Sequence, residues 1–182
     1  MSDYTTPEDL QDDLYDSKYD PDKRFEPDNG KYAVEINFSE MKPRGPVGQN
    51  NVILGQRYSF GLNVMSGPTQ EGGLNPAGKT FFTDVFVPGG DWNDPVYEAR
   101  NGRSVQEVET GDKQSFRSVL DSFGWSRELG TLYRTDANVF KGAKAVVKVS
   151  WKVPKGKPVG TEPRMYVNFD VEASKQLREN EG

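Results

Sequence analysis

Residues 31–38 read KYAVEINF, and this stretch decides the fold because apolar and polar side chains alternate along it. A period of two predicts a β-strand with one buried and one solvated face. The next stretch, SEMKPRGPVGQNN at residues 39–51, is rich in Pro, Gly and Asn and predicts a loop. The side chains expected to point inward from this first strand are Tyr32, Val34, Ile36 and Phe38.

Four later stretches repeat the alternation and predict four further strands. In the third strand, KTFFTDVFV at residues 79–87, the facing follows from Asp84, because burying an unpaired carboxylate costs several kcal/mol. Phe82 and Phe86 then lie on the outside. The inward sets are Tyr58, Phe60, Leu62 and Val64; Phe81, Thr83, Val85 and Val87; Val147, Val149, Trp151 and Val153; and Met165, Val167, Phe169 and Val171.

One amphipathic helix is expected between the third and fourth strands. Residues 112–124, DKQSFRSVLDSFG, place apolar side chains at helical spacing, with Asp112 as the expected N-cap and Gly124 as the stop. Three strands, a helix and two strands is the layout of the five-stranded OB barrel. A β-sandwich with one helical insertion is the alternative fold.

Composition narrows the possible chemistry. The chain has no cysteine and no histidine, which removes thiolate nucleophiles, imidazole bases and the usual zinc ligands. We therefore expect a binding protein and no enzyme, with no cofactor, no metal and no catalytic residue. No apolar run is long enough to span a bilayer and the N-terminus lacks the features of a signal peptide, so a soluble, cytoplasmic protein is expected.

Charge divides the chain into two parts. Residues 1–30 hold ten acids and three bases, whereas the remainder has 18 acids and 20 bases and is slightly basic. The first part is rich in charge and Pro and poor in aliphatic residues, which is typical of disorder. The expected organisation is an acidic disordered tail at residues 1–29, a folded domain at 30–173 and a polar C-terminal tail at 174–182.

The stretch GLNPAGKT at residues 73–80 matches the phosphate-binding loop of nucleotide hydrolases. That loop works between a strand and a helix, whose N-terminus and backbone NH groups converge on the phosphates. Here a strand-like stretch follows Thr80 and no parallel α/β series is visible. A chance match in a Gly-rich loop is the preferred interpretation, and nucleotide hydrolysis is the less favoured one.

The outer face of the predicted sheet combines aromatic and basic side chains. Bases of single-stranded nucleic acid stack on such rings while Lys and Arg contact phosphates, and neither interaction requires a particular sequence. The alternative is that the aromatic rings pack under a loop and the lysines form an ordinary solvated face. The candidate nucleic-acid-binding residues are Arg57, Lys79, Phe82, Phe86, Trp92, Tyr97, Arg100, Arg103, Lys148, Lys152, Lys155, Lys157 and Tyr166.

Four short motifs resemble the OB-fold single-stranded DNA-binding proteins of tailed phages: Gly30-Lys31-Tyr32, SFRSVLDSFGW at 115–125, Phe140-Lys141-Gly142 and YVNFDV at 166–171. The resemblance covers residues 30–172. It implies coating and protection of single-stranded DNA in phage replication or recombination, in the host cytoplasm. It also implies contacts with replication or recombination proteins through an acidic tail, although here that tail is N-terminal. An all-β virion structural protein is the alternative function.

Overall fold

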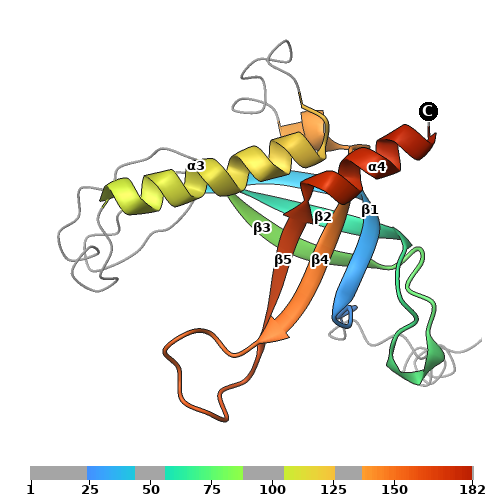
Figure 1. Cartoon of the computed structure of the whole chain (residues 1–182), viewed down its shortest axis with the longest axis horizontal. Coiled ribbons are helices and arrows are strands. Elements are labelled where there is room, and N and C mark those ends of the chain that lie inside the picture. The colour runs from blue at the N-terminus through green and yellow to red at the C-terminus, as the bar shows by residue number, and fades with distance from the viewer. Residues whose placement is uncertain (1–23, 44–55, 88–104, 126–136, 182) are drawn as a thin grey trace, which may run out of the picture.

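The computed structural model describes residues 24–43, 56–87, 105–125 and 137–181. These residues form one five-stranded sheet with a helix between the third and fourth strands, as predicted, and a second helix at the C-terminal end (Figure 1). The elements are β1 (Gly30–Pro43), β2 (Gln56–Ser66), the 3-10 helix η1 (Glu71–Gly73), β3 (Thr80–Val87), α3 (Val105–Ser122), the 3-10 helix η4 (Ala137–Phe140), β4 (Lys144–Lys152), β5 (Arg164–Asp170) and α4 (Val171–Glu181).

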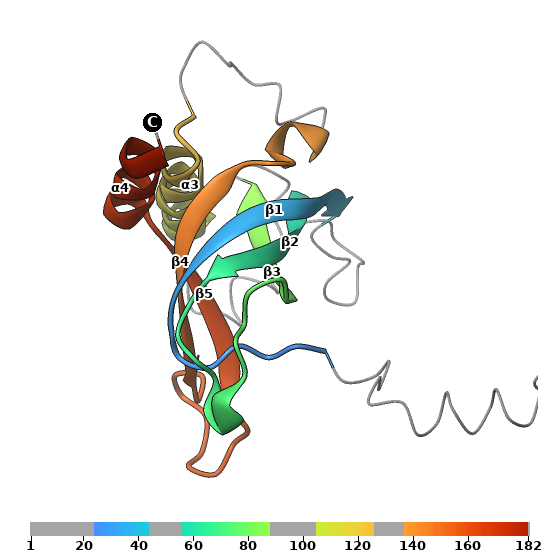
Figure 2. The ribbon, with the colours of Figure 1, turned by 90° about the vertical axis from the view of Figure 1, so that its right-hand side faces the viewer.

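The strands lie in the order β3-β2-β1-β4-β5, and each neighbouring pair is antiparallel. The sheet coils strongly, so that β4 and β5 run across the direction of β2 and β3 (Figures 1 and 2). Within the described residues β3 and β5 do not pair, so the predicted closure into a barrel is not seen. Helix α3 contacts both β3 and β5.

The core lies on the inner face of this coiled sheet, between the strands and α3. Tyr58 and Phe60 on β2 stack with ring centroids 5.7 Å apart, and Phe140 meets each of them edge-on at 5.1 and 5.2 Å. Phe116 and Val119 of α3 close the cluster. The predicted facing of the strands is confirmed for the buried residues Tyr32, Val34, Ile36, Tyr58, Phe60, Leu62, Val64, Phe81, Val85, Val87, Val147 and Val149.

The predicted facing is wrong for Phe38 and Val153, and the predicted loop at residues 39–43 is also wrong. β1 continues through residues 39–43, which were expected to be a loop, and Phe38 points outward with 40% of its surface exposed. Val153 lies beyond the end of β4 and is also exposed, whereas Trp151 is half-buried. On the edge strand β5, Met165, Val167 and Phe169 pack against the core as predicted but are only partly buried.

Helix α3 ends where the sequence predicts and begins earlier. Gly124 has a φ of 71° and the amide of Trp125 donates to the carbonyl of Leu120 at 2.9 Å, which is a glycine-terminated helix end. The helix begins at Val105, so Asp112 lies inside it and is not the N-cap. Residues 105–111 carry little apolar periodicity, which is why the sequence pattern missed the first turns.

Residues 174–182 were expected to be a polar tail, but residues up to Glu181 belong to α4, which lies beside α3 (Figures 1 and 2). Asp170 caps this helix by accepting a hydrogen bond from the amide of Ala173 at 3.0 Å. The Arg178 guanidinium donates to the carbonyls of Ser122 and Asp121 at the end of α3, where a cation favours the helix dipole. Long-range polar contacts therefore fix a helix whose sequence has little apolar character.

Residues 24–29, expected to belong to the disordered tail, lie against the domain. The indole Nε1 of Trp151 donates to the carbonyl of Pro27 at 2.7 Å, and the backbone amide of Trp151 donates to Oδ1 of Asn29 at 2.7 Å. The amide of Asp28 donates to the side chain of Gln70 at 2.7 Å. This segment, which we call the N-terminal strap, thus joins the end of β4 to the β2–β3 connection.

Tyr32 links the N-terminal strap to the core. Its hydroxyl donates to the carbonyl of Asp28 at 2.7 Å and accepts from Nε2 of Gln70 at 2.9 Å. Burial is the main cause that raises the pKa of Tyr32 above its ordinary value, and the Gln70 hydrogen bond opposes it. The neutral phenol is therefore the form that the fold holds.

Among the described residues, no helix has both the length and the apolar character to cross a membrane.

Candidate nucleic-acid interface

The outer face of β1, β2 and β3 is organised in cross-strand rows. Directly opposed residues of antiparallel strands share a face, so the register assigns each row. One row contains Phe38, Gly61 and Phe82. The next contains Glu40, Ser59 and Asp84, and a third contains Lys42, Arg57 and Phe86.

Three exposed rings, Phe38, Phe82 and Phe86, form what we call the aromatic patch. Their exposed fractions are 40%, 47% and 39%, and the predicted outward facing of Phe82 and Phe86 is confirmed. Phe38 and Phe82 meet edge-to-face with centroids 6.1 Å apart, on either side of Gly61. A Cβ at Gly61 would lie 2.6 Å from Oδ1 of Asn37, 2.8 Å from Cβ of Phe38 and 3.3 Å from Cε1 of Phe82, so the missing side chain makes room for Asn37 and for both phenylalanines.

Phe38 joins this patch because β1 has a bulge. Ile36 pairs with Leu62 and Phe38 pairs with Gly61, which leaves Asn37 as an extra residue. Regular alternation beyond Ile36 would bury the charged residues 40 and 42; the bulge buries Ser39 instead and packs Met41 against the core. Met41 is the one sign of the bulge in the sequence, because it breaks the alternation set by the earlier apolar residues at positions 32, 34 and 36.

Asp84, the one acid between the rings of β3, is held by two donors. Nη1 of Arg57 donates to its Oδ2 at 2.6 Å, and the Ser59 hydroxyl donates to its Oδ1 at 2.6 Å. Arg57 therefore pairs with a carboxylate in the structure, whereas it was expected to contact phosphate. On β1 the Lys42 ammonium lies 3.1 Å from Glu40, so this part of the face has little net charge.

Unpaired cations gather on β4, β5 and the loop between them. Among the described residues, no carboxylate lies within ion-pair distance of Lys148 or Lys152, and Lys152 lies over the ring of Tyr166 with Nζ 4.9 Å from its centroid. This basic strip consists of Lys148, Lys152, Lys155, Lys157 and Arg164; all five are exposed, and Arg164 was not predicted as a site residue.

Asp170 lies beside the start of the basic strip. The hydrogen bond from Lys31, at 2.8 Å, is the largest cause that lowers the pKa of this carboxyl below its ordinary value. The hydrogen bond from the amide of Ala173 and the charge of Lys148 lower it further. Lys31 is therefore in direct ion-pair contact with Asp170, whereas Lys148 acts on this carboxyl only through its charge.

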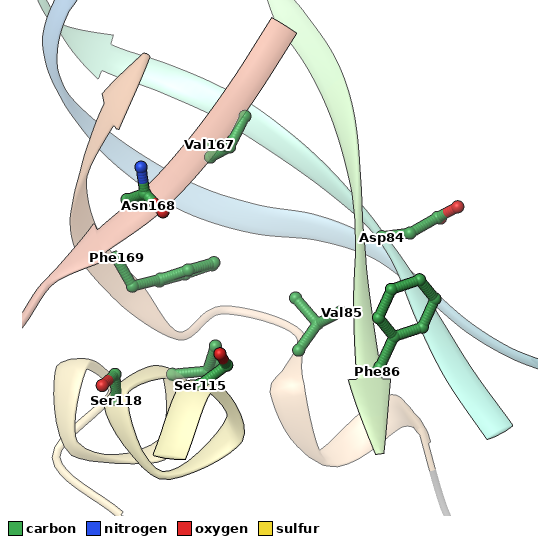
Figure 3. A pocket seen from close by; sticks show the side chains of 9 residues that line it. Asp84, Val85, Phe86, Ser115, Ser118, Val167, Asn168 and Phe169 are labelled. Atoms are coloured by element: carbon green, nitrogen blue, oxygen red, sulfur yellow. The ribbon is translucent and has the colours of Figure 1, made fainter. Parts of the chain in front are cut away.

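A pocket of about 280 Å³ occupies the gap between β3 and β5 (Figure 3). Val85 and Phe169 point toward each other across it, and Ser115 and Ser118 of α3 also line it. Phe86 of the aromatic patch lies on one wall and Asn168 of β5 on the other. Residues of β3 and β5 thus line one pocket, although the two strands are at opposite ends of the strand order.

The remaining predicted residues divide into two groups. Lys79 is exposed immediately before β3. Trp92, Tyr97, Arg100 and Arg103 lie outside the described residues.

The phosphate-loop match, residues 73–80, belongs to a hairpin connection. The amide of Gly78 donates to the carbonyl of Val64, and the amide of Val64 donates to the carbonyl of Lys79, both at 2.8 Å. The loop leads into β3 and no helix begins there, so the interpretation as a chance match agrees with the structure. Within the described ranges, no cluster of three or more potential metal-ligating acids occurs.

Comparison of the sequence with protein-family models and with curated proteins finds no match.

Proposed function

We propose that this protein binds single-stranded DNA through the outer face of its sheet, with an open OB-type barrel as the scaffold. The strand order β3-β2-β1-β4-β5 with a helix after β3 is compatible with this scaffold, and OB folds bind oligonucleotides on the face of their second and third strands. Coating of the strand during phage replication or recombination is the role that we infer.

The observation that carries the proposal is the aromatic patch. Three phenylalanines on one solvent-exposed face are unfavourable in water unless something covers them. Nucleobases can stack on such rings whatever their sequence, and each stacked base contributes about 1–3 kcal/mol. The basic strip supplies cations for phosphate contact, and among the described residues neither Lys148 nor Lys152 has a carboxylate within ion-pair distance. The pocket between β3 and β5 is lined by Phe86 of the aromatic patch and by Asn168, the residue that pairs with Lys148 across β4 and β5.

Fluorescence anisotropy with a labelled 12-nucleotide single strand tests the proposal. We expect binding that is weaker for the duplex, with log affinity falling linearly with log salt by about 0.7 per phosphate neutralised. Phe82→Ala and Phe86→Ala should each weaken binding by about 1–3 kcal/mol. Leu74→Ala is the matched control, because Leu74 is 47% exposed like Phe82 but lies in the β2–β3 connection. Unchanged affinity in both phenylalanine variants would reject this face.

A structural role in a virion is the second candidate. The pairing of Arg57 with Asp84 and of Lys42 with Glu40 favours it, because it leaves the surroundings of the aromatic patch nearly neutral, as at many protein contacts. In that case the chain should self-associate, and Phe82→Ser should reduce its mass in light scattering while wild-type protein ignores DNA.

A further inference from the structure

Asp84 lies between the two rings of β3 that the proposed function uses for stacking. Phe82 and Phe86 are two residues away on either side and on the same face, which is about 6.7 Å along a strand. Figure 3 shows Asp84 and Phe86 on the side of β3 away from Phe169. A base stacked on either ring would therefore have its edge within reach of the carboxylate.

The carboxylate is fixed and still has capacity to accept. Ser59 and Arg57 each donate to one of its oxygens at 2.6 Å, and an ionised carboxylate has about four acceptor positions. Its side chain is 36% exposed, so the unused positions can reach a ligand. Arg57 also balances the negative charge, which reduces the repulsion that a lone acid would exert on a nearby phosphate.

We infer that Asp84 selects bases that carry an exocyclic amino group, a preference that rests on the proposed single-stranded DNA binding. Ionised carboxylates only accept hydrogen bonds, and the amino groups of cytosine and adenine donate them. Thymine and uracil offer one N–H between two carbonyl oxygens, and these oxygens would face the carboxylate. The face would then favour bases with an amino group, whereas stacking alone would tolerate every base.

The octamers dC8 and dU8 test this inference, because their bases differ at one edge: cytosine carries the exocyclic amino group and an unprotonated ring nitrogen where uracil carries a carbonyl and the ring N–H. Anisotropy titrations at pH 7.5 and one salt concentration should give dC8 a roughly five- to tenfold higher affinity in the wild-type protein. This ratio needs no variant, so it remains a test even where a substitution disturbs the fold.

Asp84→Asn assigns the preference to the carboxylate. The amide retains an acceptor for Arg57 but presents a donor to the base, so the dC8 to dU8 ratio should fall to about one. Glu40→Gln is the matched control: it removes the same charge from the same cross-strand row, on the other side of Ser59. It should change both affinities by the same factor. Circular dichroism checks that both variants fold.

Two results overturn the inference, and they differ in what they leave standing. If the wild-type protein binds dC8 and dU8 equally, or Asp84→Asn retains the wild-type ratio, base selection by Asp84 is wrong. In that case Phe82→Ala can still weaken both octamers equally, and the proposed function stands. If neither octamer binds, the proposed function fails together with the inference.

Discussion

Replacing Trp151 by phenylalanine tests whether the N-terminal strap is part of the fold. The substitution keeps an aromatic ring on β4 and removes the indole donor that lies 2.7 Å from the carbonyl of Pro27. Pro27 is fully buried, so its carbonyl loses its indole partner away from bulk water, at a cost of about 1–3 kcal/mol. With a small loss of packing, we expect the free energy of unfolding to fall by about 2 kcal/mol.

Urea denaturation followed by circular dichroism measures this loss without depending on tryptophan emission. Trp151→Ala should cost more, about 2–4 kcal/mol, which is less than for a fully buried ring because Trp151 is half-buried. The decisive comparison is Trp151→Phe in a chain lacking residues 1–29, where the acceptor carbonyl is gone and the substitution should cost nearly nothing. An equal cost in the full-length and shortened chains would refute the anchoring of the N-terminal strap.

Three further predictions concern the tail, pH and nucleotides. Removing residues 1–23, which carry eight acids and two bases, should tighten single-stranded DNA binding most at low salt. The reason is that a tethered polyanion competes with DNA for the basic strip. Equal affinities of the full-length and shortened chains across a salt series would exclude this competition. Folding lowers the pKa of Asp170, so the ionised carboxylate stabilises the fold at pH values above the pKa of the unfolded chain. This stabilisation is lost as the pH falls through the pKa of the folded protein. Asp170→Asn should therefore reduce the dependence of the free energy of unfolding on pH, measured between pH 7 and 2. Magnesium-dependent ATP hydrolysis should stay at background in the wild-type protein and in Lys79→Ala, and an activity abolished by that substitution would contradict the hairpin assignment of residues 73–80.

The sequence predicts the strands well because each has one buried face, which produces the alternation. The prediction from alternation fails at β1 because it assumes that successive residues face opposite sides of the sheet, and the extra residue at the Asn37 bulge breaks this rule. The prediction fails at α4 because that helix depends on distant partners: the Ser174 hydroxyl accepts from the amide of Val146, and Arg178 donates to the carbonyl of Ser122. A pattern read along the chain contains no information about such contacts.

The candidate interface could be predicted in part for a similar reason. The cost of burying Asp84 correctly placed Phe82 and Phe86 on the outside. The pairing of Asp84 with Arg57 depends on the register between β2 and β3, which alternation within one strand does not determine. Phe38 was missed as an interface residue because the alternation was continued past Ile36, and this placed Phe38 inside. The bulge at Asn37 turns it outward.

The bulge in β1 makes Asn37 an insertion that the strand absorbs. Deleting Asn37 would remove this irregularity, together with the hydrogen bond that its side chain donates to Thr80, while Ile36 still faces Leu62, Phe38 still faces Gly61 and Ser39 still faces Phe60. Two chains differing by this one residue would show opposite alternation in their sequences beyond Ile36 and yet present the same side chains to solvent. Chain length can therefore vary at this position while the aromatic surface is conserved.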